Sequence, residues 1–279
     1  MEEGGLDADG ATSRWERTIA SLVAWKPDVA CLQEMSARRD SHKLRKHLWA
    51  TANALGMVPI LGSEGGVSGN HPAIMVSAAR LIVPDEGPPP RAVGHDPAWC
   101  EALLRVRPAG PVIRAYSVHL PPRSAAAQLI QAQRLATSTA QRGELGVVCG
   151  DWNCYARGDQ LTADILASMP PHLRPARMRV GLGKELTANY DVHDALTAVG
   201  LIDVAAGLPP SCRLPHELTP TGINGGGRGD RFYVTGEVWE SGAVESYAQK
   251  DGGGSDHHMA LITIRLDKLA AAVAPGFCP

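Results

Sequence analysis

The sequence predicts a single α/β domain of the α+β type, built around mixed β-sheet. Short apolar runs typical of buried strands alternate in part with segments whose apolar residues recur at helical spacing. Two neighbouring strand-like runs are joined across Ala109-Gly110-Pro111, which predicts a hairpin and therefore a mixed rather than a purely parallel sheet. The elements on both sides of the proline-rich run 84–90 have the same strand-like character, so we interpret this run as a surface loop and expect one domain over 1–279.

Five segments are expected to be helical. The first should begin at Ser13, because Ser13 and Glu16 match a capping box, and it should end at Lys26, because Pro27 disfavours helical geometry in the residue before it. The other four helices are expected at about 40–55, 124–142, 160–168 and 192–199.

The strands are expected where apolar runs are short and bounded by polar or turn residues. The domain core should cover about 14–266, and 267–279 should form a loosely held tail. The predicted strands are "DVACLQE" (28–34), "AIMVSA" (73–78), "LLRVRP" (103–108), 112–120, "LGVVCG" (145–150), "RFYVTG" (231–236), "VESYA" (244–248) and 258–266.

The composition is that of an ordinary globular protein, with 44% hydrophobic and 20% charged residues. The net charge of −2 gives no global positive field that would draw the protein onto nucleic acid or an anionic membrane. No apolar run approaches roughly 18 residues, so no membrane span is expected. The six cysteines form no CxxC pair, which favours reduced thiols and a cytoplasmic location.

Polar side chains occupy the ends of the predicted strands. A single carboxylate or histidine at a strand end is usually a solvated terminus or a cap, but several in one chain favour a shared cleft at one edge of a sheet. Asp230 and the pair Asp256-His257 each begin such a segment, whereas the others end one. The full set is Gln33, Glu34, His119, Asp151, Asn153, Asp230, Asp256 and His257.

Five motifs resemble the ordered motifs of the endonuclease/exonuclease/phosphatase superfamily: "DVACLQE", "YSVHLPP", "GDWN", "GRGDRFYVT" and "GSDHH". The resemblance spans residues 14 to 266. It implies a four-layered α/β sandwich, in which two packed mixed sheets are flanked by helices. It also implies a metal-dependent phosphoesterase that hydrolyses a phosphodiester or a phosphomonoester by in-line attack of water.

The resemblance assigns metal binding to two carboxylates. Glu34 would bind Mg²⁺, with Mn²⁺ as the alternative, because hard divalent cations favour carboxylate oxygens. Asp256 would contribute to the same metal site, and Asp151 would lie near the metal or position the nucleophile. The metal would neutralise the charge of the phosphate and of the leaving group.

The resemblance also assigns catalytic and substrate-binding roles. His257 would be the general base, and Asp230 would hold its imidazole in the correct tautomer. Asn153 would donate a hydrogen bond to the phosphoryl oxygens, and His119 would act as a second electrophile or acid at the phosphate. Asn70 is a further candidate for contact with the substrate.

One departure from the family pattern concerns its first strand. The family normally opens with a strand that ends in asparagine and is followed by a glycine-containing loop, and here "MEEGGLD" resembles that loop. Two interpretations stay open: the start is set too far downstream, or the protein lacks the family's first strand.

The substrate is not predicted beyond a phosphate ester of a nucleic acid or a small molecule. Basic residues are clustered only locally, and aromatic residues, at 5%, are too few to suggest a stacking platform for single strands. No obligate protein partner is expected. The alternative is a catalytically impaired family member that serves as a binding or scaffold module, which would not need to retain all the polar strand ends. One basic cluster contains Arg38, Arg39, Lys43, Arg45 and Lys46, and the other contains Arg174, Arg177 and Arg179.

Overall fold

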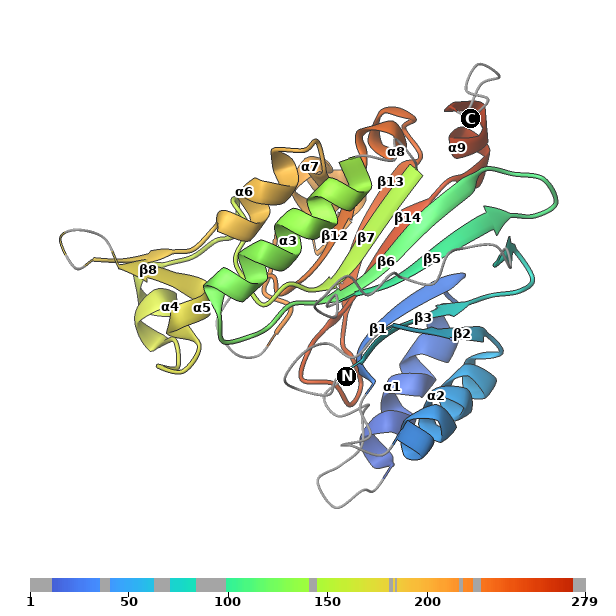
Figure 1. Cartoon of the computed structure of the whole chain (residues 1–279), viewed down its shortest axis with the longest axis horizontal. Coiled ribbons are helices and arrows are strands. Elements are labelled where there is room, and N and C mark those ends of the chain that lie inside the picture. The colour runs from blue at the N-terminus through green and yellow to red at the C-terminus, as the bar shows by residue number, and fades with distance from the viewer. Residues whose placement is uncertain are drawn as a thin grey trace.

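A six-stranded mixed sheet forms the centre of the computed structural model (Figure 1). In this sheet β6 and β7 are parallel, and the other neighbours are antiparallel. Its strand order is β10 (Ile202–Asp203), β12 (Asp230–Val234), β7 (Leu145–Asp151), β6 (Val112–His119), β5 (Trp99–Val106) and β4 (Leu81–Ile82). The structure describes residues 12–35, 41–62, 71–83, 99–140, 145–180, 183, 185–215, 218–222 and 227–272.

Three smaller sheets account for the remaining strands of the described ranges. Two have three strands each, and the third is a two-stranded hairpin. The mixed α/β fold is therefore confirmed, but the described strands form four hydrogen-bonded sheets where two were expected. The orders are β1 (Val29–Met35), β3 (His71–Val76), β2 (Val58–Leu61); β11 (Arg213–Leu214), β13 (Val244–Lys250), β14 (Met259–Ile264); and β8 (Met178–Val180) with β9 (Leu186–Ala188).

Helices cover the outer faces of the sheets. Helices α3 (Ala125–Ala140) and α6 (Asp191–Thr197) pack on one face of the six-stranded sheet, where Leu135 and Leu196 are fully buried. Helices α1 (Ser13–Trp25) and α2 (Ser41–Leu55) pack on β1-β3-β2. The short helices are α4 (Ala163–Ser168), α5 (Arg174–Arg177), α7 (Val204–Gly207), η3 (Pro210–Cys212), α8 (Gly236–Glu240) and α9 (Leu266–Ala272).

The opposite face of the six-stranded sheet is buried by the two three-stranded sheets. Ile74 of β3 and Tyr247 of β13 belong to the same apolar cluster as Leu104 of β5. Partly buried Cys31 of β1 and Ile262 of β14 pack against this cluster. Burial of apolar surface between the sheets is the main stabilising contribution that such a core makes.

The boundaries of α1 follow from its caps. Thr12 is the N-cap, one residue before the predicted start, and its hydroxyl donates a hydrogen bond of 2.7 Å to the Glu16 carboxylate. Lys26 ends the helix in the left-handed conformation, at φ 50°, and its N–H bonds to the carbonyl of Leu22 at 3.1 Å. The helix thus ends before Pro27, as predicted.

The segment predicted as a loosely held tail begins with a helix. In α9 Leu269 is fully buried in the main core, and Leu266, three residues earlier on the same face, packs against it. The rest of that tail (273–279) and the proline-rich run 84–90 lie outside the described residues. Cys31, Cys100, Cys149, Cys154 and Cys212 are free thiols.

Across the described ranges, no helix combines the length and the apolar character that crossing a membrane would require.

Gly150 allows β6 and β7 to lie close together just before the strands end. It has φ 152°, and a Cβ at this position would overlap the carbonyl oxygen of Val118 on β6. Any other residue would therefore have to push the two strands apart. The following residue, Asp151, depends on this close approach for its place beside His119.

Candidate active site

The strand register brings three predicted site residues together at one edge of the six-stranded sheet. Asp151, the last residue of β7, lies opposite His119 on the parallel strand β6 and opposite Asp230 on the antiparallel strand β12. Directly opposed residues present their side chains on the same face of a sheet. The expectation that these strand ends share one site is consistent with this register.

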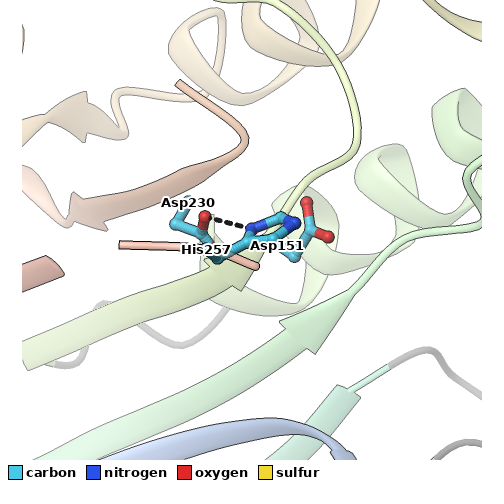
Figure 2. A group of neighbouring side chains, drawn as sticks. All are labelled: Asp151, Asp230 and His257. Carbon is cyan, nitrogen blue, oxygen red and sulfur yellow. Dashed lines mark hydrogen bonds and ion pairs between the residues drawn. The ribbon is translucent and has the colours of Figure 1, made fainter. Parts of the chain in front are cut away.

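His257 and Asp230 form a hydrogen-bonded pair. The Nδ1 atom of His257 lies 2.6 Å from Oδ2 of Asp230, and Figure 2 shows the imidazole ring between Asp230 and Asp151. Thr221 supports this pair twice: its hydroxyl oxygen accepts from the Asp230 N–H at 2.8 Å, and its carbonyl accepts from the His258 N–H at 2.7 Å. The pair therefore has a fixed mutual orientation, the arrangement by which a carboxylate holds a catalytic histidine.

The surrounding carboxylates stabilise the charged form of His257. Burial by itself would lower the pKa of this imidazole, but the negative charge and the hydrogen bond of Asp230 outweigh burial, and Asp151 and Asp256 add to the effect. Together they raise the pKa of His257 to about 10. In the absence of a cation, the ring therefore carries a proton at neutral pH.

Glu34 lies in an irregular part of β1 that turns its carboxylate toward the site. The pairing of β1 with β3 shifts between Leu32 and Met35, and Glu34 itself has a left-handed φ of 59°. The preceding residue, Gln33, donates from Nε2 to the Ser117 hydroxyl at 3.2 Å, which ties β1 to β6. A left-handed conformation at a residue other than glycine is unfavourable and is often found at functional sites.

His119 lies between two carboxylates. Its Nε2 atom is 3.5 Å from Oε1 of Glu34 and 3.9 Å from Oδ2 of Asp151, and only 9% of its side chain is exposed. The imidazole thus connects β1 with β7, and its predicted role at the phosphate stays a prediction.

Asn153 holds the carboxylate of Asp151. Its backbone N–H donates to Oδ1 of Asp151 at 2.9 Å, and its side-chain Nδ2 donates to Oδ2 at 3.1 Å and to the carbonyl of Leu120 at 3.0 Å. Asn153 also has a left-handed φ of 50°, and its own carbonyl accepts from the Gln128 amide at 2.9 Å. The predicted role of Asn153 as a donor to the phosphoryl oxygens stays a prediction, because its amide donors here face protein oxygens.

Asp151 is an anion in this setting. Burial would raise the pKa of its carboxyl, but the positive charges of His257 and His119, the Asn153 N–H and the charge of Arg177 together lower it below the ordinary value. A buried carboxylate that stays ionised is suited to bind a cation or to orient a water molecule.

The donor set fits a divalent cation. Ligand atoms of Asp151, Asp230 and His257 all lie within 4.8 Å of one another, and carboxylate oxygens are the ligands that Mg²⁺ and Mn²⁺ favour. The two predicted metal ligands, Glu34 and Asp256, do not belong to this group. The Glu34 carboxylate approaches His119 instead. Asn70 lies outside the described residues.

Several residues that position the site were not identified from the sequence. Thr221, Ser117 and Gln128 form hydrogen bonds to the site segments, and no local sequence pattern marks them. Arg177 was noticed only as part of a basic cluster, yet its Nη2 donates to Oδ1 of Asn153 at 3.1 Å. The basic character of that segment was the only available signal.

The stability that the His257–Asp230 pair contributes should depend on pH. The pKa of the imidazole rises from about 6.5 in the unfolded chain to about 10 in the folded protein. The contribution is therefore complete below the unfolded value, decreases as the pH rises, and is lost above the folded value. With chelator present, His257→Gln should unfold about 2 kcal/mol more easily than wild type at about pH 6 and equally easily at about pH 10.5. Urea unfolding at both pH values measures this, and a difference that does not change with pH would contradict it.

Comparison with families of known proteins gives an independent result. A model described as the endonuclease/exonuclease/phosphatase family matches residues 4–257. No curated protein matches the chain significantly.

Solved structures with the same fold match nearly the whole chain. An endonuclease/exonuclease/phosphatase from Bacteroides vulgatus superposes with a TM-score of 0.63 at 15% identity, covering 94% of this chain and 95% of that one. An AP endonuclease from Archaeoglobus fulgidus has a TM-score of 0.58 at 20% identity, covering 90% and 94%. A mannosyl-6-phosphatase from Bacteroides thetaiotaomicron has a TM-score of 0.59 at 14% identity, covering 90% and 91%.

At these identities the solved structures bear on the fold alone, whereas the family model extends over most of the sequence and includes every predicted site residue. The chain therefore belongs to the endonuclease/exonuclease/phosphatase family, a family of metal-dependent phosphoesterases.

Proposed function

We propose that this phosphoesterase hydrolyses a phosphodiester or a phosphomonoester by in-line attack of water, in a reaction that depends on Mg²⁺, with Mn²⁺ as the alternative. The observation that carries the proposal is the 2.6 Å hydrogen bond between His257 and Asp230, formed directly beside Asp151. A scaffold would not need an aligned imidazole–carboxylate pair next to a second buried carboxylate.

With a cation bound at the site, the neutral form of His257 would orient the attacking water and accept its proton, because the positive charge of the cation opposes protonation of the ring. Asp230 holds Nδ1, so Nε2 is the nitrogen that remains for the water. Asp230 also stabilises the imidazolium that forms when the proton arrives, and Asp151, on the other side of the ring, contributes to the same effect. The proton therefore moves from water to Nε2 without leaving an unpaired charge in the site.

Glu34 and Asp151 would hold the divalent cation. We assign it to these two carboxylates because Oδ2 of Asp230 is already bonded to His257. When bound, the cation supplies charge neutralisation at the phosphoryl oxygens and at the leaving group. His119, which approaches both carboxylates, donates to a phosphoryl oxygen or protonates the leaving group.

The second layer of the predicted sandwich can be assigned to the two three-stranded sheets. Within the described strands, β1 ends one of these sheets and β14 ends the other. Both sheets cover the same face of the six-stranded sheet through a shared apolar cluster. We assign the family's first strand to the position between β1 and β14, the end strands of the two sheets. A strand in that position would join the two three-stranded sheets into one layer.

The experiment that tests the function compares a chromogenic diester, a chromogenic monoester and plasmid DNA as substrates. Wild type should turn over at least one of them with Mg²⁺, lose this activity in chelator and regain it when Mg²⁺ is restored. Glu34→Gln should raise the Mg²⁺ concentration for half-maximal rate at least about tenfold. Full activity in chelator would exclude the metal-dependent mechanism, and a folded wild type inactive on all three substrates would favour the scaffold alternative.

A further inference from the structure

The described residues of the range 155–190 form an arm with an apolar cluster of its own. This arm contains α4, α5, β8 and β9, and it projects from the end of the molecule where α3 begins (Figure 1). Its cluster centres on the buried side chains of Tyr155, Met169 and Met178. The arm is therefore a packed unit.

Three arginines of the arm form one of the two local basic clusters of the sequence, and in the structure each has a different partner. Arg174 donates to the carbonyls of Met169 and Ala167, at 3.0 and 3.1 Å, and thus stabilises the arm itself. Arg179 forms an ion pair with Asp191. Arg177, at the end of α5, reaches out of the arm and donates from Nη2 to Oδ1 of Asn153 at 3.1 Å.

The contact of Arg177 acts together with those of Leu120 and Asp151 to determine which way the Asn153 amide faces. A guanidinium can only donate hydrogen bonds, and the carbonyl of Leu120 can only accept them. Oδ1 of Asn153 must therefore face Arg177, and Nδ2 must face Leu120 and Asp151, as observed at 3.0 and 3.1 Å. The reverse orientation would place N–H groups against the guanidinium and would leave the Asp151 carboxylate without its side-chain donor.

We propose that Arg177 is a positioning residue for the hydrolytic site, which rests on the function proposed above. It acts through the Asn153 amide, which in turn fixes the carboxylate of Asp151 between His119 and His257. Arg177 does not contact the reacting atoms in this arrangement. The arm thus contributes to the rate of the reaction.

The kinetic test replaces Arg177 in the full-length protein and measures kcat and KM in saturating Mg²⁺. Arg177→Met should lower kcat about tenfold while KM changes less than about threefold. Arg177→Lys, which keeps one donor, should give an intermediate kcat. Arg179→Met, in the same arm but directed at Asp191, is the matched control and should stay within about twofold of wild type. A raised KM at unchanged kcat would overturn the proposal, because it would show direct substrate binding.

A double-mutant comparison identifies Asn153 as the intermediary. In the Asn153→Ala background, Arg177→Met should lower kcat by less than about twofold, because the group through which it acts is gone. An undiminished tenfold loss in that background would overturn the proposal. Circular dichroism checks folding, and unfolding of Arg177→Met and Arg177→Lys while Arg179→Met stays folded would assign Arg177 a purely structural role.

A readout without activity separates this proposal from the proposed function. The side-chain amide signals of Asn153, identified by their loss in Asn153→Ala, should shift and exchange faster with solvent in Arg177→Met but not in Arg179→Met. Unchanged signals in Arg177→Met would overturn the positioning role. An inactive wild type in which these shifts still occur would count against the hydrolytic function and leave the contact confirmed.

Discussion

His257→Ala is expected to hydrolyse the preferred phosphate ester at least about 100-fold more slowly than wild type in saturating Mg²⁺. The substitution removes the imidazole nitrogen that accepts the proton of the attacking water. It also removes the hydrogen bond of 2.6 Å that the imidazole makes with Asp230. Initial rates at saturating substrate measure the loss.

His258→Ala is the matched control for this substitution. The His258 side chain is exposed. The described contact of His258 with Thr221 is made by its backbone N–H, which alanine retains. Its rate should stay within about twofold of wild type. Equal rates in wild type and His257→Ala would remove the proposed mechanism, whereas equal losses in both histidine variants would indicate damage to the segment rather than loss of a base.

Arg228→Met is expected to reduce the free energy of unfolding by about 3–5 kcal/mol. The Arg228 guanidinium is buried between two carboxylates: it donates to Asp159 at 2.7 Å and to both oxygens of Asp203, at 2.7 and 3.1 Å. These side chains are no more than 3% exposed. Methionine fills a similar volume but leaves two buried carboxylates with only the charge of Arg231, which lies 4.0 Å from Asp159, so urea unfolding should show a large decrease in stability.

An exposed arginine provides the comparison. Arg157 makes a bidentate contact with Asp194, at 2.6 and 2.7 Å, but 63% of its side chain is exposed to solvent. Solvent screens this pair, so Arg157→Met should reduce the stability far less than Arg228→Met does. Equal effects of the two substitutions would show that the burial of the Arg228 cluster does not determine its contribution.

The sequence was most informative where an apolar run ends on a polar residue. The ends of β6 and β7 at His119 and Asp151 and the start of β12 at Asp230 agree with the predicted positions. Strands β6 and β7 are buried on both faces, so each is a largely apolar run and the polar residue that ends it is easy to recognise. The arm was predicted less well. Strand β8 has only three residues and an exposed Val180, so it carries no alternating pattern to recognise.

The site residues could be predicted as a group, but the connections among them could not. Motif order indicated that His257 and Asp230 belong together, and the structure places them in hydrogen-bonding contact. Thr221 and Arg177 join separate segments through hydrogen bonds that depend on the packing of the loops. Such contacts leave no periodicity in the sequence, and the left-handed conformation of Asn153 is likewise set by its surroundings.

The register described for β6, β7 and β12 has a consequence for how this protein can diverge. His119 and Asp230 are both aligned on Asp151, so the loss or gain of one residue within β7 would turn its carboxylate to the other face of the sheet. Insertions and deletions should therefore be absent from β7 in related proteins that keep the activity. The arm and the surface connections can change in length without disturbing the alignment, and new substrate preferences can evolve there.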